Sequence, residues 1–249
     1  MTAQIADYLL AFADDEHLMG QHHTEWIGVA PFLEEDLAFS SIGQDELGHA
    51  VLVYELVLGL DGVTPTDEAV DHLAFRRGPG EYRSCALTEY PASDWADALV
   101  RHWLYDRVEQ ERWALVAESS MSALRDVAVR AEREEVFHRR HADALLDALV
   151  DAPDARPRLL VALDTLLPMV PSLLTPPPGE TAAIAEGVAT GSLADLAGPI
   201  AEAIGLRFGI ATPTLAPGDP AARTTRTADF EPLLARMCEV LDLDPEATW

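Results

Sequence analysis

Apolar residues recur at helical spacing along most of the chain, and no stretch alternates between apolar and polar positions as a strand would. Ile5, Leu9 and Phe12 begin one such pattern, and a second begins after the next group of turn-forming residues. These patterns predict helices over residues 3–26 and from about 32 to 58. We therefore predict an all-α protein.

Two further long helices are expected after a loop rich in turn residues, which we place at residues 59–92. Ser93 or Asp94 suits the N-cap of a helix that runs to about Glu118. A serine-rich turn then separates this helix from a fourth one over residues 123–150. The four helices form two consecutive hairpins, and such short connections favour a ferritin-like, antiparallel four-helix bundle.

The C-terminal part has a weaker pattern and predicts additional C-terminal helices, over residues 157–173, 193–206 and 230–240. A proline-rich break at residues 176–178 is too short to act as a domain linker. We therefore expect a single ferritin-like domain over residues 1–249, with a bundle core (3–150) and a C-terminal helical extension (151–249).

The formal net charge of −26 comes from 43 acidic residues against 17 Lys and Arg, and it would repel a nucleic-acid backbone. No uninterrupted apolar run reaches the roughly 20 residues that cross a bilayer. The first residues carry acids where a signal peptide would carry bases. We predict a cytoplasmic protein that binds neither nucleic acid nor membrane. Two cysteines, Cys85 and Cys238, are too few for a thiolate metal site.

Two Glu-x-x-His motifs are the strongest chemical signal in the chain. They are Glu46-Leu47-Gly48-His49 in the second predicted helix and Glu135-Val136-Phe137-His138 in the fourth. Residues three apart share a helix face, so each motif presents a carboxylate and an imidazole together. Bundles that hold two metal ions need this pair of motifs and one more carboxylate from each of the other two helices.

Hairpin symmetry identifies the two missing carboxylates, because positions equidistant from an antiparallel turn lie at one level. Glu46 lies 15 residues after the first turn at Pro31, and the residue 15 positions before Pro31 is Glu16. The same symmetry about the serine-rich turn places Glu135 opposite Asp106. The predicted metal ligands are therefore Glu16, Glu46, His49, Asp106, Glu135 and His138.

Three other acids compete for these roles: Glu25, Glu109 and Glu111. Glu25 lies too near the first turn to reach the level of Glu46. Glu109 would serve if the third helix were kinked or differently phased, and it remains a reserve ligand. We prefer Asp106, because its shorter side chain leaves more room at the metal for oxygen or substrate.

Solvated charges or ion pairs are the simpler explanation for acidic helices of this composition. Against it, Glu46 and His49 lie in a largely apolar stretch between Ile42 and Val53, and Asp106 follows an aromatic-rich stretch. Unpaired carboxylates on buried faces are costly, and bound metal offsets that cost. Four carboxylates and two imidazoles suit two iron ions (Fe2+/Fe3+), with manganese as the alternative.

Several neighbours are candidates for supporting roles. Asp45 and Glu134 each precede a ligand glutamate, and we predict that they hydrogen-bond the ligand histidines of neighbouring helices. His141 is either a hydrogen-bond donor behind a ligand or a surface histidine beside two arginines, and the sequence leaves both open. His22 and His23, near the end of the first helix, are not predicted as ligands.

At these residues the sequence resembles the phenylacetyl-CoA epoxidase family, the multicomponent bacterial oxygenases of aerobic phenylacetate degradation. Most of the chain resembles the non-catalytic, structural member of such an enzyme, at residues 20–21, 24–26, 30–31, 33–36, 99–106, 137–142 and the closing Pro245-Glu246-Ala247-Thr248-Trp249. Around the predicted ligands the chain is more similar to the catalytic member, at residues 44–49, 103–106 and 134–138.

The resemblance implies oxygen activation at a reduced two-iron centre, with one oxygen atom inserted into a small organic substrate and the other reduced to water. The substrate would be a CoA thioester such as phenylacetyl-CoA. Glu46 and Glu135 would be the catalytic, bridging carboxylates, and His49 and His138 would hold one iron each. A separate reductase would supply electrons, since the chain has no flavin fingerprint and no iron–sulfur cysteine set.

Assembly and catalysis leave alternatives. The resemblance implies paired subunits, and we predict a homodimer made largely by the first two helices, or a heteromer with a related protein. A non-catalytic scaffold that retains the ligands is the main alternative to a monooxygenase. A ferroxidase or iron-binding bundle is a further one, disfavoured because the C-terminal extension is typical of partner contacts. Single-turnover oxygen consumption by the reduced protein separates the first two.

Overall fold

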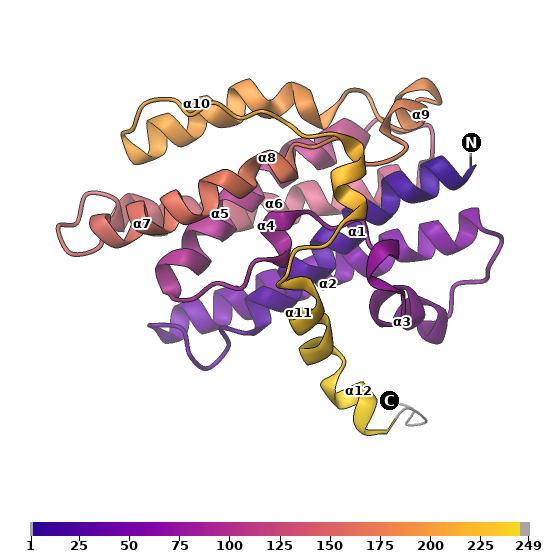
Figure 1. Ribbon diagram of the computed structural model, residues 1–249, viewed down its shortest axis with the longest axis horizontal. Coiled ribbons are helices and arrows are strands. Elements are labelled where there is room, and N and C mark those ends of the chain that lie inside the picture. Colours follow the sequence, from indigo (N-terminus) through magenta and orange to yellow (C-terminus); the bar gives the residue numbers. More distant parts are fainter. Residues whose placement is uncertain (1, 245–249) are drawn as a thin grey trace.

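Four long helices lie side by side in the computed structural model, which describes residues 2–244 (Figure 1). They are α1 (Thr2–Thr24), α2 (Leu33–Leu60), α5 (Trp95–Val116) and α6 (Ser122–Leu149). Helix α1 packs along α2, α5 packs along α6, and α2 also contacts α6. Every regular element in the described part of the chain is helical, and the predicted all-α, ferritin-like bundle is confirmed.

Local capping explains where the predicted helices begin. The Asp94 side chain accepts a hydrogen bond from the backbone N–H of Asp97 at 3.0 Å, as an N-cap residue does. In the first hairpin, Asp36 accepts hydrogen bonds from the N–H groups of Gly28 (3.0 Å) and Ala30 (3.1 Å). This carboxylate therefore closes the turn between α1 and α2 and stands near the positive end of the α2 dipole.

Helix α1 is enclosed on every side by its own chain. The consecutive residues Asp14, Asp15, Glu16 and His17 are only 1%, 0%, 0% and 5% exposed. Four consecutive positions cover the whole circumference of a helix, so an amphipathic surface helix could not bury all of them. The bundle covers one side of α1, while the segments around residues 76–90 and 220–227 cover the other (Figure 1).

Two glycines let α1 and α2 approach closely beside the predicted site. A Cβ atom on Gly20 would lie 2.7 Å from Leu47 Cγ and 3.0 Å from the carbonyl oxygen of Gly43. A Cβ atom on Gly43 would lie 3.0 Å from the carbonyl oxygen of Gly20. Both glycines are about one helical turn from a predicted ligand, so this contact brings Glu16 and Glu46 to one level.

The C-terminal extension packs its apolar side against the bundle, mainly on α5 (Figure 1). The predicted fifth helix is made of α7, η2 and α8, and the next one of η3 and α10. Leu99 of α5, Leu163 of α7 and Ile204 of α10 share one buried cluster. These elements and the last two helices are α7 (Arg156–Leu166), η2 (Leu167–Met169), α8 (Val170–Leu173), η3 (Leu193–Leu196), α10 (Ala197–Phe208), α11 (Phe230–Met237) and α12 (Glu239–Leu243).

Several segments predicted as loops contain short helices, so those predictions were wrong. They are α3 (Asp67–Phe75), η1 (Pro79–Glu81), α4 (Ala86–Glu89), α9 (Glu180–Ala185) and η4 (Pro220–Thr224). Each is too short to show an apolar period: α3, for example, buries only Val70 and Ala74. It depends instead on its cap, where the Thr66 hydroxyl accepts a hydrogen bond from the N–H of Ala69 at 3.2 Å.

No helix between residues 2 and 244 is both long enough and apolar enough to span a membrane. The C-terminal pentapeptide at 245–249, which carries part of the family resemblance, lies outside the described residues.

Candidate metal centre

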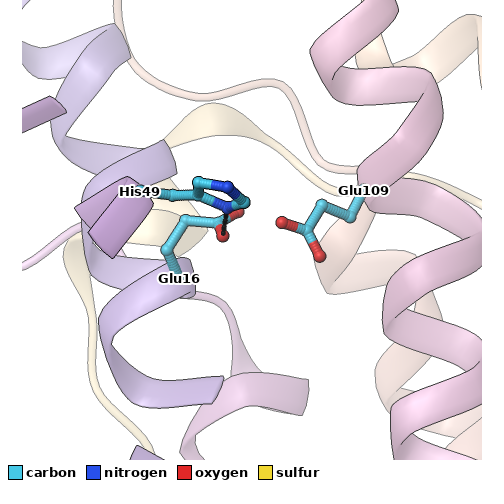
Figure 2. A group of neighbouring side chains, drawn as sticks. All are labelled: Glu16, His49 and Glu109. Carbon is cyan, nitrogen blue, oxygen red and sulfur yellow. Dashed lines mark hydrogen bonds and ion pairs between the residues drawn. The ribbon is translucent and has the colours of Figure 1, made fainter. Parts of the chain in front are cut away.

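The bundle core contains five carboxylates and two imidazoles, none of them more than 1% exposed: Glu16, Glu46, His49, Asp106, Glu109, Glu135 and His138. Two sets among them bring one possible ligand atom each to within 4.8 Å of the others. The first ligand group is Glu16, His49 and Glu109, and the second ligand group is Glu46, Asp106 and Glu109. Figure 2 shows the Glu109 carboxylate pointing from α5 toward Glu16 and His49.

Glu109 belongs to both ligand groups, although the sequence made it only a reserve ligand. Asp106 and Glu109 are three residues apart on α5 and therefore share one face. The symmetry of a hairpin selects one residue per level, so it identified Asp106 and had no means of adding its neighbour. The structure places Glu109 beside Asp106, and the preference for Asp106 as the ligand of this helix stays a prediction.

The second Glu-x-x-His motif lies against the same carboxylates. His138 Nδ1 is 3.0 Å from Glu135 Oε1, in ion-pair contact but without hydrogen-bond geometry. The charges of Glu109 and Asp106 both act on Glu135, which places the three carboxylates near one another. All six residues predicted from the sequence therefore face the interior of the bundle.

The two motif histidines are oriented by carboxylates outside the cluster, as predicted. His49 Nε2 lies 2.7 Å from Glu134 Oε2, and His138 Nε2 lies 3.3 Å from Asp45 Oδ2. Each histidine thereby turns Nδ1 inward, and His49 Nδ1 reaches to 3.3 Å from Glu16 Oε2 (Figure 2). Metal-binding histidines commonly use one ring nitrogen for the ion and the other for an orienting carboxylate.

Seven buried atoms of this cluster have no hydrogen-bond partner among the described residues. They are Glu46 Oε1, both carboxylate oxygens of Asp106, Glu109 Oε2, both carboxylate oxygens of Glu135, and His138 Nδ1. Leaving a buried acceptor unpaired costs roughly 1–3 kcal/mol, so six such oxygens together represent a large destabilisation. Cations between them would satisfy these oxygens, and the donor set of carboxylate and imidazole fits iron or manganese.

The local charge balance also calls for cations. Within the described part of the chain, Arg112 is the arginine that comes within ion-pair distance of the five carboxylates, at 3.7 Å from Glu16 Oε1. Burial raises the pKa of Glu16 to about 7. Burial and the charge of Glu109 raise the pKa of Glu135 to about 8. The same causes hold the pKa of Glu46 well above its ordinary value.

These pKa shifts predict how the metal-free protein responds to pH. A carboxyl group whose pKa is raised by folding stabilises the folded state below its unfolded pKa, and that contribution is lost as the pH rises through the folded pKa. The folded pKa values of Glu16 and Glu135 are about 7 and about 8. The melting temperature of metal-free protein is therefore expected to fall by at least about 3 °C between about pH 6.5 and pH 8.5.

Differential scanning calorimetry checks this, with Glu135→Gln as the matched control. The variant cannot ionise at position 135, so its melting temperature should fall less over the same interval. Equal slopes for the two proteins would contradict the raised pKa of Glu135. Protein loaded with metal should show a smaller fall, because bound cations favour the ionised carboxylates.

Two residues next to the cluster were not predicted as part of it. His23 Nδ1 lies 2.8 Å from Glu46 Oε2, although the sequence gave this histidine little weight. The Tyr105 hydroxyl donates a hydrogen bond to Glu16 Oε1 at 3.0 Å. Only the burial of both side chains, 1% and 0% exposed, distinguishes them from ordinary core residues, and the sequence does not show that burial.

A row of histidines leads from the cluster to the start of α2. His102 Nδ1 lies 3.1 Å from Asp106 Oδ2, and His102 Nε2 lies 3.3 Å from His141 Nδ1. His141 Nε2 in turn lies 2.8 Å from Glu35 Oε2. His141 is therefore a partner of His102, behind Asp106, which decides between the two interpretations of this residue.

The competing acids lie elsewhere. Glu25 Oε2 is 3.0 Å from His22 Nδ1, near the α1–α2 turn, and His22 Nε2 is 3.0 Å from the carbonyl oxygen of Thr88. Glu111 is exposed on the outer side of α5. None of these side chains belongs to either ligand group.

Comparison with known proteins agrees with this site. The family model described as "Phenylacetic acid catabolic protein" matches residues 1–249. Two different components of the 1,2-phenylacetyl-CoA epoxidase of Escherichia coli (strain K12) are similar to the chain. It is 32% identical to the first over 153 residues, which are 61% of this chain and 59% of that protein. It is 26% identical to the second over 152 residues, which are 57% of this chain and 47% of that protein. The matches thus span between about half and three fifths of these two relatives.

Proposed function

Because the chain belongs to the phenylacetic acid catabolic protein family, we propose that it is a two-iron monooxygenase that oxidises an organic substrate with dioxygen. The observation that carries this proposal is the set of unpartnered carboxylate oxygens on four facing helices, beside two oriented histidines. Both relatives are subunits of an epoxidase whose name specifies a phenylacetyl-CoA substrate, so we propose a CoA thioester such as phenylacetyl-CoA.

The two ligand groups define which residues would hold each ion. Glu16 and His49 would hold one, Asp106 and the Glu135–His138 pair would hold the other, and Glu46 and Glu109 lie where they can contribute to both. Iron in this site would supply electrons for the reduction of dioxygen. A separate reductase is needed to return those electrons.

The protein's own part is to bind, orient and exclude water. Glu134 and Asp45 fix the histidine rings, and the Tyr105 hydroxyl fixes Glu16. Trp113, which is fully buried, donates to Glu109 Oε1 at 3.1 Å and packs edge-to-face on His49. These contacts hold the ligands in a site from which the described chain excludes solvent, and preorganised sites of this kind favour oxidation of a bound substrate over side reactions with water.

Single-turnover oxygen consumption tests the proposal. Metal-free protein is loaded anaerobically with Fe2+, the iron content per chain is measured, and air-saturated buffer is then mixed in while dissolved oxygen is recorded. We expect a pair of iron ions per chain and rapid oxygen uptake. The Glu135→Gln variant is the control, because it retains its size and loses one ligand charge, and its oxygen uptake should be strongly reduced.

The outcomes separate the alternatives. An iron content near zero in the wild-type protein would exclude the metal centre and with it the proposed function. A full iron content without oxygen uptake would favour a non-catalytic part of a multicomponent oxygenase. Oxygen uptake that oxidises only iron, with no change in an added phenylacetyl-CoA, would favour a ferroxidase.

A further inference from the structure

Asp15, the residue before Glu16, is held by an unusually complete set of donors. Its carboxylate is 0% exposed and accepts hydrogen bonds from the backbone N–H of Cys85 at 2.8 Å and from the Thr88 hydroxyl at 3.1 Å. Arg112 Nη1 donates to Asp15 Oδ2 at 2.8 Å, and Arg223 Nη1 donates to the same oxygen at 2.7 Å. Asp15 is thus fixed from four directions, and its backbone is continuous with that of Glu16.

Arg223 comes from the C-terminal segment, in η4, which passes over α1 in the yellow part of the ribbon (Figure 1). Its guanidinium is buried and also donates to three backbone carbonyl oxygens, of Thr175 (3.1 Å), Arg83 (3.1 Å) and Leu173 (3.2 Å). One side chain therefore ties the C-terminal segment to α1, to the end of α8 and to the loop before α4.

Arg112 extends this contact to the metal centre. While Nη1 donates to Asp15, its Nη2 lies 3.7 Å from Glu16 Oε1. Arg112 is also one helical turn beyond Glu109 on α5, so its position sets the distance between the Glu16 and Glu109 sides of the first ligand group. Without Arg223, Asp15 would keep Arg112 as its one charged partner, and both side chains could shift.

We propose that Arg223 is a positioning residue for the first ligand group: the C-terminal segment, acting through Asp15 and Arg112, holds Glu16 and Glu109 at the distance that binds a metal ion. This inference rests on the proposed function, because it assumes a metal at these ligands. It assigns the C-terminal extension a role in the centre itself, beyond covering the bundle.

Cobalt(II) titration of metal-free protein tests the proposal without any turnover. The variants are Arg223→Met and, as a matched control, Arg226→Met. Arg226 lies three residues away and is nearly as buried, but its ion-pair partner is Glu89 at 2.5 Å, and it does not contact Asp15. Cobalt binding is followed by visible absorption, and the melting temperature of each metal-free protein is recorded in parallel.

We expect Arg223→Met to bind one cobalt ion about 10 to 100 times more weakly, the usual effect of losing an outer partner, while the other ion keeps its affinity. Arg226→Met should lower the melting temperature by a similar amount and leave both cobalt affinities within about twofold. Equal weakening of both ions in Arg223→Met, or equal effects of the two variants, would overturn the proposal.

A milder variant covers the case in which Arg223→Met does not fold. Arg223→Lys keeps the charge beside Asp15 but cannot reach all three carbonyl oxygens, since a lysine lacks the forked guanidinium. A selective loss at one cobalt ion supports the proposal, and unchanged affinity at both contradicts it. If the wild-type protein binds no cobalt, the proposed function itself has failed, which is distinct from both results.

Discussion

Replacing Glu135 or Glu46 by alanine is expected to prevent the pair of iron ions from binding, whereas replacing His141 by alanine should leave both ions in place. Both glutamates are fully buried and offer unpartnered oxygens to the cluster. His141 contacts His102 and Glu35 instead, at 3.3 Å and 2.8 Å, and reaches no ligand directly. Losing one of few charged ligands costs far more affinity than losing a remote donor.

Iron content per chain after anaerobic reconstitution measures this difference, and circular dichroism confirms that each variant is folded. We expect close to a full pair of ions in the wild-type protein and in His141→Ala, and less than about half of it in the two glutamate variants. Equal iron contents in all three variants would show that the wrong face of the bundle has been assigned.

The same measurement decides between Asp106 and Glu109. If Asp106 is the ligand on α5, as we predict, Asp106→Asn should lose more iron than Glu109→Gln. The opposite order would assign the role to Glu109, which belongs to both ligand groups in the structure.

The sequence predicted the bundle well, because the relevant signals are local. Caps such as Asp94 and the apolar period place the long helices to within a few residues. The register between helices also followed from the chain, since short turns force residues such as Glu16 and Glu46 to one level. The orientation of His49 by Glu134 could be predicted for the same reason: the site is built from positions fixed by two hairpins.

What the sequence did not predict depends on contacts between distant segments. Arg223 meets Asp15 across 208 positions of the chain, and no local pattern marks either residue as buried. Glu109 resembles the solvated acids of any helix until α1 and α2 are placed opposite it. The short helices α3 and α9 are stabilised by caps and by neighbouring segments, so their sequences carry no period to detect.

Assembly is the second large effect that the structure predicts. The α1–α2 turn and the beginning of α2 expose a group of large apolar side chains: Ile27 (47%), Val29 (66%), Phe32 (67%), Leu33 (69%) and Leu37 (64%). Val136 and Phe137 of α6, 41% and 49% exposed, add to the apolar surface. A patch of this kind in a soluble protein commonly marks an interface.

The position of this patch refines the predicted interface. Helix α1 is enclosed by its own chain and has little surface to offer, so α2, the turn before it and α6 are left to form the contact. We expect a two-fold pairing of this chain with itself that buries well over about 1,000 Å² in total. The alternative partner is a related protein of the same family.

Leu37→Glu is therefore expected to convert a dimer into a monomer, because two charges per two-fold interface would be buried without partners. Leu206→Glu on α10 is the matched control, since Leu206 is 87% exposed and lies outside the patch. Sedimentation velocity at micromolar concentration distinguishes the species, and equal behaviour of the two variants would place the interface elsewhere. A wild-type monomer that pairs only after a related family member is added would refute self-pairing, and it would strengthen the interpretation of this chain as one part of a larger oxygenase.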